Sequence, residues 1–182
     1  MASSSFVHLQ CQSEYSVKNS LIRVPKLIES VQLGGMDSVA LTDDMSLFSA
    51  VKFYQKAIDS GVKPIIGAKV VLDFSLGQYD VILLCQNNEG YLNLSELISK
   101  AYLSEHGIED VSVTEEQLIE HQSGLIMIAT SVSSDIAQLL LANESKLAEE
   151  KALSWKSIFS DRYYMSVPVS YTHLTLPTKR IV

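Results

Sequence analysis

The sequence has few cysteines, fewer basic than acidic residues, and no long apolar run. Its two cysteines, Cys11 and Cys85, form no CxxC pair, which excludes a multi-cysteine framework. Each lies in an apolar run, a position typical of a buried and reduced thiol. The cysteine content therefore predicts a cytosolic protein with free thiols.

Basic residues are outnumbered, with 14 Lys and Arg against 21 Asp and Glu, so the net charge is −7. An acidic surface repels phosphate groups, and this argues against non-specific DNA binding by the chain alone. No apolar run approaches the roughly 18 residues that a membrane span needs. The first ten residues also lack the basic and apolar segments of a signal peptide. We expect a cytoplasmic protein with no membrane contact.

The chain has 182 residues, of which 47% are hydrophobic, and this composition is typical of a globular domain. Residues 39–72 are the most informative stretch, because two β-branched runs, 39–42 and 64–71, flank an amphipathic segment. The apolar residues that recur there at helical spacing are Leu47, Phe48, Val51, Tyr54 and Ile58. Gly61 follows at the expected left-handed helix end. This pattern predicts a βαβ unit with parallel strands and a right-handed crossover.

Helical and strand patterns alternate along the rest of the chain, which favours the α/β class with a parallel sheet. The run 78–85 is apolar on both faces, as buried parallel strands are. The other predicted strands are 6–11, 124–129 and 162–165. The predicted helices are 25–33, 87–104, 114–121, 134–141 and 144–159. In parallel α/β folds functional groups collect past the strand C-termini, so Asp43, Asp44 and residues 67–69 are candidate functional positions.

Several spaced motifs carry a family resemblance. Residues 6–16 read FVHLQCQSEYS, and LTDD, AVKFY and KPIIGAK follow in that order within residues 41–69. Together they resemble the PHP (polymerase and histidinol phosphatase) domain, and more narrowly the amino-terminal domain of bacterial DNA polymerase III alpha subunits. The resemblance implies a PHP-type distorted (β/α)7 TIM-like barrel, here incomplete because its C-terminal barrel units are missing. We expect a disordered segment 1–5 and a partial PHP domain over 6–166.

The resemblance also implies where a metal site would lie. In the PHP family a His-x-His pair, an Asp-His pair and a further carboxylate hold divalent metals for phosphoester hydrolysis. Only Asp43 keeps the family ligand, since the amide oxygen of glutamine binds zinc or manganese weakly and a lysine opposes cation binding. We therefore expect a vestigial site with no catalytic residue and no bound metal. The corresponding positions in this chain are Gln10, Gln12, Asp43, Asp44 and Lys69.

Two further residues are candidates for a supporting role at this site, His8 and Glu14. His8 lies two residues before Gln10, so it shares that residue's side of a strand. A hydrogen-bonded structural histidine is expected there rather than a ligand, because a lone histidine has no partners to complete a site. His106 and His121 lie in polar surroundings and are predicted to be surface residues.

Lys69 suggests what replaced the metal. Its ammonium group can lie where the metal charge balanced the carboxylates, paired with Asp43 or Asp44. The alternative is a lysine that is simply solvated on a loop, because lysine is rarely buried.

The resemblance implies a non-catalytic domain that supports the polymerase core and docks the separate proofreading exonuclease subunit. The parent would add deoxynucleotides on a template with Mg²⁺, and DNA would bind only through domains missing here. No cofactor is expected for this fragment, whose partners would be the rest of the alpha chain and the exonuclease. The alternative is a metal-dependent PHP phosphoesterase related to histidinol phosphatase. A third reading is a mis-assembled frame with no function, which would expose a barrel edge and aggregate.

The end of the chain does not continue the family pattern. Residues 170–182, SYTHLTLPTKRIV, have no helical or strand period and resemble translated sequencing-adapter tails. We predict that 167–182 is a non-native tail, so His173 is given no functional weight.

Overall fold

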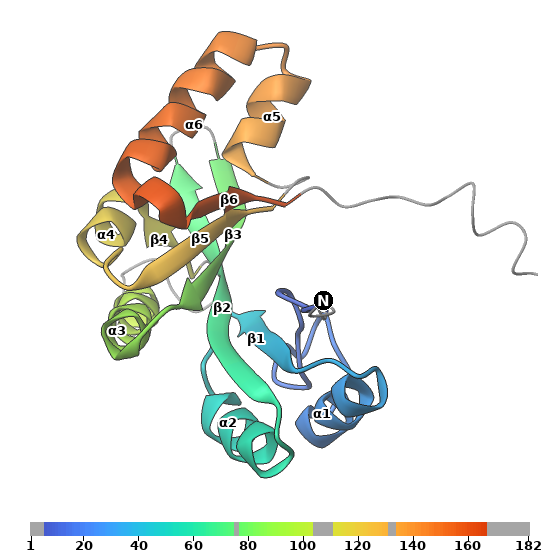
Figure 1. Ribbon diagram of the computed structural model, residues 1–182. Coiled ribbons are helices and arrows are strands. Elements are labelled where there is room, and N and C mark those ends of the chain that lie inside the picture. Colours follow the sequence, from blue (N-terminus) through green and yellow to red (C-terminus); the bar gives the residue numbers. More distant parts are fainter. Residues whose placement is uncertain (1–5, 75–76, 104–110, 131–133, 167–182) are drawn as a thin grey trace, which may run out of the picture.

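The computed structural model describes residues 6–74, 77–103, 111–130 and 134–166. Within them, one mixed sheet has the strand order β1-β2-β3-β5-β6, with β4 paired to β2 (Figure 1). The strands are β1 Ser38–Asp44, β2 Lys63–Phe74, β3 Gly77–Cys85, β4 Val113–Thr114, β5 Leu125–Ala129 and β6 Tyr163–Met165. The helices are α1 Val24–Leu33, α2 Ala50–Asp59, α3 Asn88–Leu103, α4 Glu115–Glu120, α5 Asp135–Leu141 and α6 Ser145–Phe159, with a 3₁₀ turn at Ser160–Arg162. The predictions for residues 1–5, 167–182, His106 and His173 fall outside the described residues.

The predicted βαβ unit is confirmed. β1 and β2 pair in parallel, and α2 forms the crossover between them. Gly61 has a φ of +69°, so the chain reverses after α2 in a conformation that a side chain would strain. The register places Asp44, the last residue of β1, opposite Lys69 of β2.

The apolar stripe predicted for α2 is real, but it does not face the core. The helix buries Ala50, Phe53 and Ala57 instead. Val51 and Tyr54 keep 64% and 53% of their surface exposed. Periodicity shows that a helix has an apolar face, but it cannot tell which of two adjacent apolar faces meets the sheet. Here Phe53 and Ala57 pack in the core that α2 shares with α1 and β1, and the more hydrophobic stripe lies to one side of them.

The sheet is mixed, so the prediction of a parallel sheet was wrong. β3 pairs antiparallel with both β2 and β5, whereas β5 and β6 are parallel. Phe74 and Gly77 are paired across the end of the β2–β3 hairpin, and a connection this short can join only antiparallel strands. β3 is buried on both faces as expected, but burial carries no information about strand direction.

The predicted strand 6–11 is reduced to one isolated parallel bridge between His8 and Val39. Its backbone still runs beside β1, because His8 O accepts from Ala40 N at 2.8 Å and Cys11 O accepts from Thr42 N at 2.7 Å. These bonds hold the amino-terminal segment against the free edge of β1, next to the candidate site.

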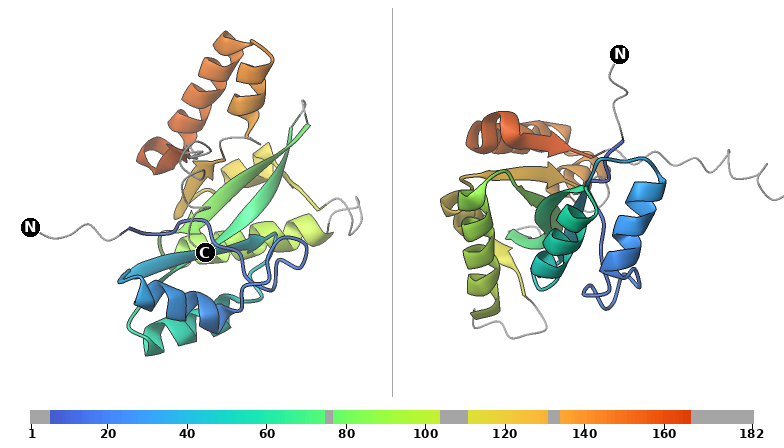
Figure 2. Two further views of the ribbon diagram at one scale, coloured as in Figure 1. Left: turned by 90° about the vertical axis from the view of Figure 1, so that its right-hand side faces the viewer. Right: turned by 60° about the horizontal axis from the view of Figure 1, so that its bottom comes forward.

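The long strand β2 joins two separate helical layers. Its first half pairs with β1, where α1 and α2 cover one core. Its second half pairs with β3 and β4 and enters a larger core that includes Trp155 and Phe159 of α6. The views in Figures 1 and 2 agree that α1 and α2 lie at one end of the molecule and α5 and α6 at the other.

Two of the predicted helices begin with a side-chain cap. Thr114 and Gln117 form a reciprocal capping box at α4. At the start of α3, Asn87 Oδ1 accepts from Gly90 N at 2.9 Å. A Cβ on Gly90 would lie 1.9 Å from the carbonyl oxygen of Gly124, so this glycine permits a backbone contact between α3 and the turn before β5. None of the described helices is long and apolar enough to span a membrane.

Both cysteines are free and partly buried, in line with the sequence-based prediction of reduced thiols. Cys85 ends β3, and burial raises the pKa of its thiol from 9.0 to about 12. Burial also raises the pKa of the Cys11 thiol. The ionised form of Cys85 is therefore disfavoured in the folded protein.

This raised pKa predicts a loss of stability in alkali. Above about pH 9 the unfolded chain releases the Cys85 proton while the folded chain holds it, so the free energy of unfolding falls as pH rises towards 12. One such group contributes about 1.4 kcal/mol per pH unit. When urea unfolding is measured between about pH 9 and pH 11, the free energy of unfolding should fall less steeply with pH for Cys85→Ala than for wild type. Ser99→Ala, on the exposed side of α3, should keep the wild-type slope; equal slopes for Cys85→Ala and wild type would contradict the assignment.

Candidate functional site

The C-terminal end of β1 and the middle of β2 bring together three of the five predicted metal-site positions. Lys69 Nζ lies 2.8 Å from Asp44 Oδ1 and 3.5 Å from Asp80 Oδ2. Gln12 Nε2 donates to the same Asp44 oxygen at 2.7 Å. The side chains of Lys69 and Asp44 are only 19% and 26% exposed. We call Gln12, Asp44, Lys69 and Asp80 the Lys69 cluster.

The second carboxylate oxygen of Asp44 is also occupied. Asn19 Nδ2 donates to Asp44 Oδ2 at 2.7 Å, and the Asp44 backbone N–H donates to Ser16 Oγ at 3.0 Å. One ammonium group and two amide groups therefore surround this carboxylate. The alternative of a lysine solvated on a loop is wrong, since Lys69 lies within β2 and makes this ion pair.

The electrostatics of Lys69 favour its charged form. Burial opposes protonation, but the hydrogen bond and charge of Asp44, with a contribution from Asp80, outweigh it and raise the pKa of Lys69. Because the pKa of Lys69 is raised, its ion pairs contribute fully to the free energy of unfolding below the ordinary lysine pKa. This contribution is lost only when the pH rises through the higher pKa of the folded state. Lys69 therefore keeps its positive charge throughout the neutral range.

Asp43 has a different environment, although it is the neighbour of Asp44. Adjacent residues of a strand point to opposite faces, so Asp43 lies on the side of α1 and α2. It is 1% exposed and accepts hydrogen bonds from Ser13 N, Ser13 Oγ, Ser16 Oγ and Ser49 Oγ. The bonds from Ser13 are 2.6 and 2.7 Å long, and that from Ser16 is 2.7 Å long. Asp43 thus connects the amino-terminal loop to the start of α2.

The serines around Asp43 were not among the residues singled out from the sequence. Ser13 and Ser16 lie in a polar connection, and Ser49 lies just before α2. Their side chains meet only because the amino-terminal segment runs along β1. A Ser-x-x-Ser spacing is the sole local signal, and it is common in turns.

The other predicted residues lie outside the Lys69 cluster. Gln10 and His8 are exposed, and the His8 ring packs edge-on against Phe6 with centroids 4.8 Å apart. Glu14 pairs with Lys52 at 2.8 Å, which links the amino-terminal loop to α2. The predicted set is therefore divided among the Lys69 cluster, the Asp43 serine network and the protein surface.

The prediction that His121 is a surface residue was wrong, because it is 7% exposed. Its Nδ1 lies 2.8 Å from the Gln117 carbonyl oxygen and its Nε2 lies 3.1 Å from Lys100 Nζ. Nε2 also lies 3.5 Å from Glu96 Oε1, so the ring has polar partners at both nitrogens. Polar neighbours in sequence did not reveal that this ring fills the space between α3 and α4.

Residues 8–169 match the PHP domain family. The chain belongs to the PHP domain family. It is 36% identical over 186 residues to the DNA polymerase III subunit alpha of Vibrio cholerae, with 97% of this chain and 16% of the relative aligned. It is 34% identical over 175 residues to the same subunit of Escherichia coli, with 92% of this chain and 15% of the relative aligned.

A solved structure confirms the type of fold. An amidohydrolase from Chromobacterium violaceum superposes with a TM-score of 0.51 at 10% identity, over 78% of this chain and 74% of that one. At this identity the likeness shows an α/β fold with a mixed sheet and nothing about activity. The PHP domain described here spans about a sixth of the length of the polymerase subunits that it matches.

The metals associated with the PHP family do not fit this site. The Lys69 ammonium group lies between two carboxylates that a cation would need, and the Asp43 carboxylate is taken up by serines. Across residues 6–74, 77–103, 111–130 and 134–166, no group of three or more His, Cys, Asp or Glu side chains is arranged to hold a metal ion. The described side chains around Asp43 and Asp44 therefore do not offer a divalent metal a set of free ligands.

The Lys69 cluster predicts that Lys69→Met destabilises the PHP domain. The substitution leaves Asp44 and Asp80 without their shared cation, at a cost of about 1–3 kcal/mol, less than for a fully buried pair. Urea unfolding of the complete domain would measure this decrease in the free energy of unfolding. Adding Asp44→Asn to Lys69→Met should recover part of the lost stability, because it removes one unpaired carboxylate. Lys26→Met, which breaks an exposed pair with Glu29, should cost less than about 0.5 kcal/mol. A loss for Lys69→Met as small as this control would show that the pair is not structural.

The serine network predicts that Asp43→Asn frees the amino-terminal loop. The asparagine NH₂ group would face serine donors, at a cost of about 2–3 kcal/mol. Hydrogen exchange should then accelerate at Ser13 and its neighbours, while Asp59→Asn on the exposed end of α2 leaves exchange unchanged. Unaltered protection of Ser13 in Asp43→Asn would refute the role given to Asp43.

Proposed function

We propose that this PHP domain is the amino-terminal part of a bacterial DNA polymerase III alpha subunit, a cytoplasmic replication protein. The support is the extent of the matches, which take up nearly all of this chain and only 15–16% of the polymerase subunits. The parent would catalyse template-directed addition of deoxynucleotides, with Mg²⁺ held in a domain outside this chain.

We propose further that the PHP domain itself has no hydrolytic activity and needs no cofactor. The observation that carries this is the ion pair between Lys69 and Asp44, where the PHP family places metal ligands. A lysine ammonium group can balance carboxylate charge, but it cannot polarise a phosphate and generate hydroxide as a metal does. The domain would act as a support for the polymerase core and as a docking module for the proofreading exonuclease subunit.

We also propose that further βα units close the sheet into the PHP-type barrel. β6 is only three residues long and forms the end of the described sheet. One sheet face carries Ile82, Leu84 and Ile128, beside a cavity of about 500 Å³ that also reaches Tyr164 of β6. An apolar sheet face next to a short edge strand is the arrangement that additional strands and helices would cover.

The decisive experiment uses the complete gene, resequenced through the codons after residue 164 and expressed in full. The product should extend a primed template with deoxynucleotides and Mg²⁺. The same product should not hydrolyse p-nitrophenyl phosphate above background with added Mn²⁺ or Zn²⁺, even when its polymerase active site is inactivated. A short gene product without polymerase activity would refute the proposal, and metal-dependent hydrolysis would favour a PHP phosphoesterase.

A further inference from the structure

The helix α2 has a second apolar face that nothing in the described structure fully covers. Val51, Tyr54 and Ile58, which we call the outer stripe, are spaced three and four residues apart and keep 64%, 53% and 54% of their surface exposed. A helix on one core needs a single apolar stripe, and α2 already buries another. The charged residues of the helix lie on its remaining side, at Lys52, Lys56 and Asp59. The helix is therefore built for two interfaces.

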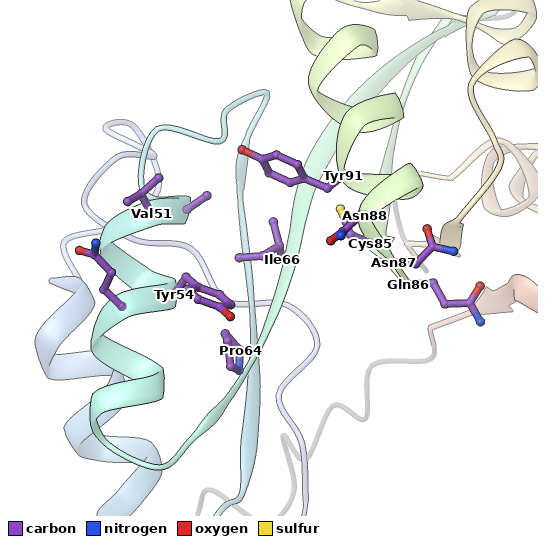
Figure 3. Close-up of a pocket in the computed structure, with 11 residues that line it drawn as sticks. Val51, Tyr54, Pro64, Ile66, Cys85, Gln86, Asn87, Asn88 and Tyr91 are labelled. Carbon is purple, nitrogen blue, oxygen red and sulfur yellow. The ribbon is translucent and has the colours of Figure 1, made fainter.

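The outer stripe borders a groove. A cavity of about 470 Å³ lies between α2 and the start of α3, with β2 as its floor. Figure 3 shows Val51 and Tyr54 on one side, Tyr91 on the other, and Pro64 and Ile66 on the strand between them. The groove is therefore lined by large apolar and aromatic groups that come from three different elements.

The chemistry of the lining restricts what can bind there. The eleven described residues that line the groove include no Asp, Glu, Lys or Arg, although charged residues make up 19% of the chain. Amide side chains supply its polar rim, among them Gln55, Gln86 and Asn88. Amides both donate and accept hydrogen bonds, so they suit the peptide groups and uncharged side chains of a polypeptide better than an ion. A contiguous apolar patch with such a rim is typical of a protein-binding surface.

We propose that this groove is the docking site for an amphipathic helix from the polypeptide that follows the PHP domain in the full-length alpha chain. The inference rests on the proposed function. The outer stripe has helical spacing along two turns, and a second helix presents a matching row of side chains. The occupant would come from the same chain, because the Vibrio cholerae relative continues far beyond the 16% of its length that aligns here. Its contact row would be apolar and uncharged.

Cysteine labelling in the full-length alpha chain tests this directly. Val51→Cys places a thiol on the outer stripe, and Lys56→Cys places one on the charged side of the same helix. Both positions are exposed in the isolated domain. Docking should make alkylation by N-ethylmaleimide at residue 51 about tenfold slower than at residue 56, measured by peptide mass spectrometry. Fraying of α2 would change both rates together, so the ratio reports the groove alone.

A second variant shows whether the protection comes from the outer stripe. Ile58→Asp added to Val51→Cys should raise the labelling rate at residue 51 to that of Lys56→Cys, because a charge would disrupt an uncharged interface. Equal rates for Val51→Cys and Lys56→Cys in the full-length chain would overturn the proposal. Protection that depends on protein concentration would assign the groove to a second copy, and protection seen only with the exonuclease subunit would assign it to that partner; both overturn it. A full-length product without polymerase activity refutes the proposed function instead, whatever the labelling ratio.

Discussion

The parallel pairing of β1 with β2 is the constraint on which the site depends. It puts Asp44 opposite Lys69 and, because neighbouring strand residues point to opposite faces, it turns Asp43 towards the helices. One carboxylate then forms an ion pair with a lysine and the other collects hydrogen bonds from three serines. Two adjacent aspartates thus perform two separate structural tasks, and neither is free to act as a metal ligand.

A tethered ammonium group and a bound metal solve the same electrostatic problem in different ways. Either can offset the charge of the Asp44 and Asp80 carboxylates, but the lysine is part of the chain and needs no ion from solution. Lys69 takes a position between Asp44 and Asp80 that a cation would otherwise occupy. The ammonium group offsets part of the carboxylate charge, but unlike a metal ion it cannot activate water.

The sequence allowed the βαβ unit, the helix ends and the Lys69 pair to be predicted, because each depends on local spacing or on one strand register. The direction of β3 was missed because its apolar run looks the same in parallel and antiparallel sheets. The buried face of α2 was missed because Ala50 and Ala57 carry little hydrophobic signal beside Val51 and Tyr54. The serine network around Asp43 needed the path of the amino-terminal segment along β1, which depends on tertiary structure.

The error about α2 is informative in itself. The sequence pattern identified only the more hydrophobic face of α2, whereas the structure shows which face the domain buries within itself. The alanine face of α2 packs against β2, and the outer stripe remains for another surface. Exposed apolar area of this extent favours association, so the outer stripe has the character that the proposed contact with further polypeptide requires. Under the proposed function, support of the polymerase core and the replacement of a metal ion by Lys69 would be two consequences of one role.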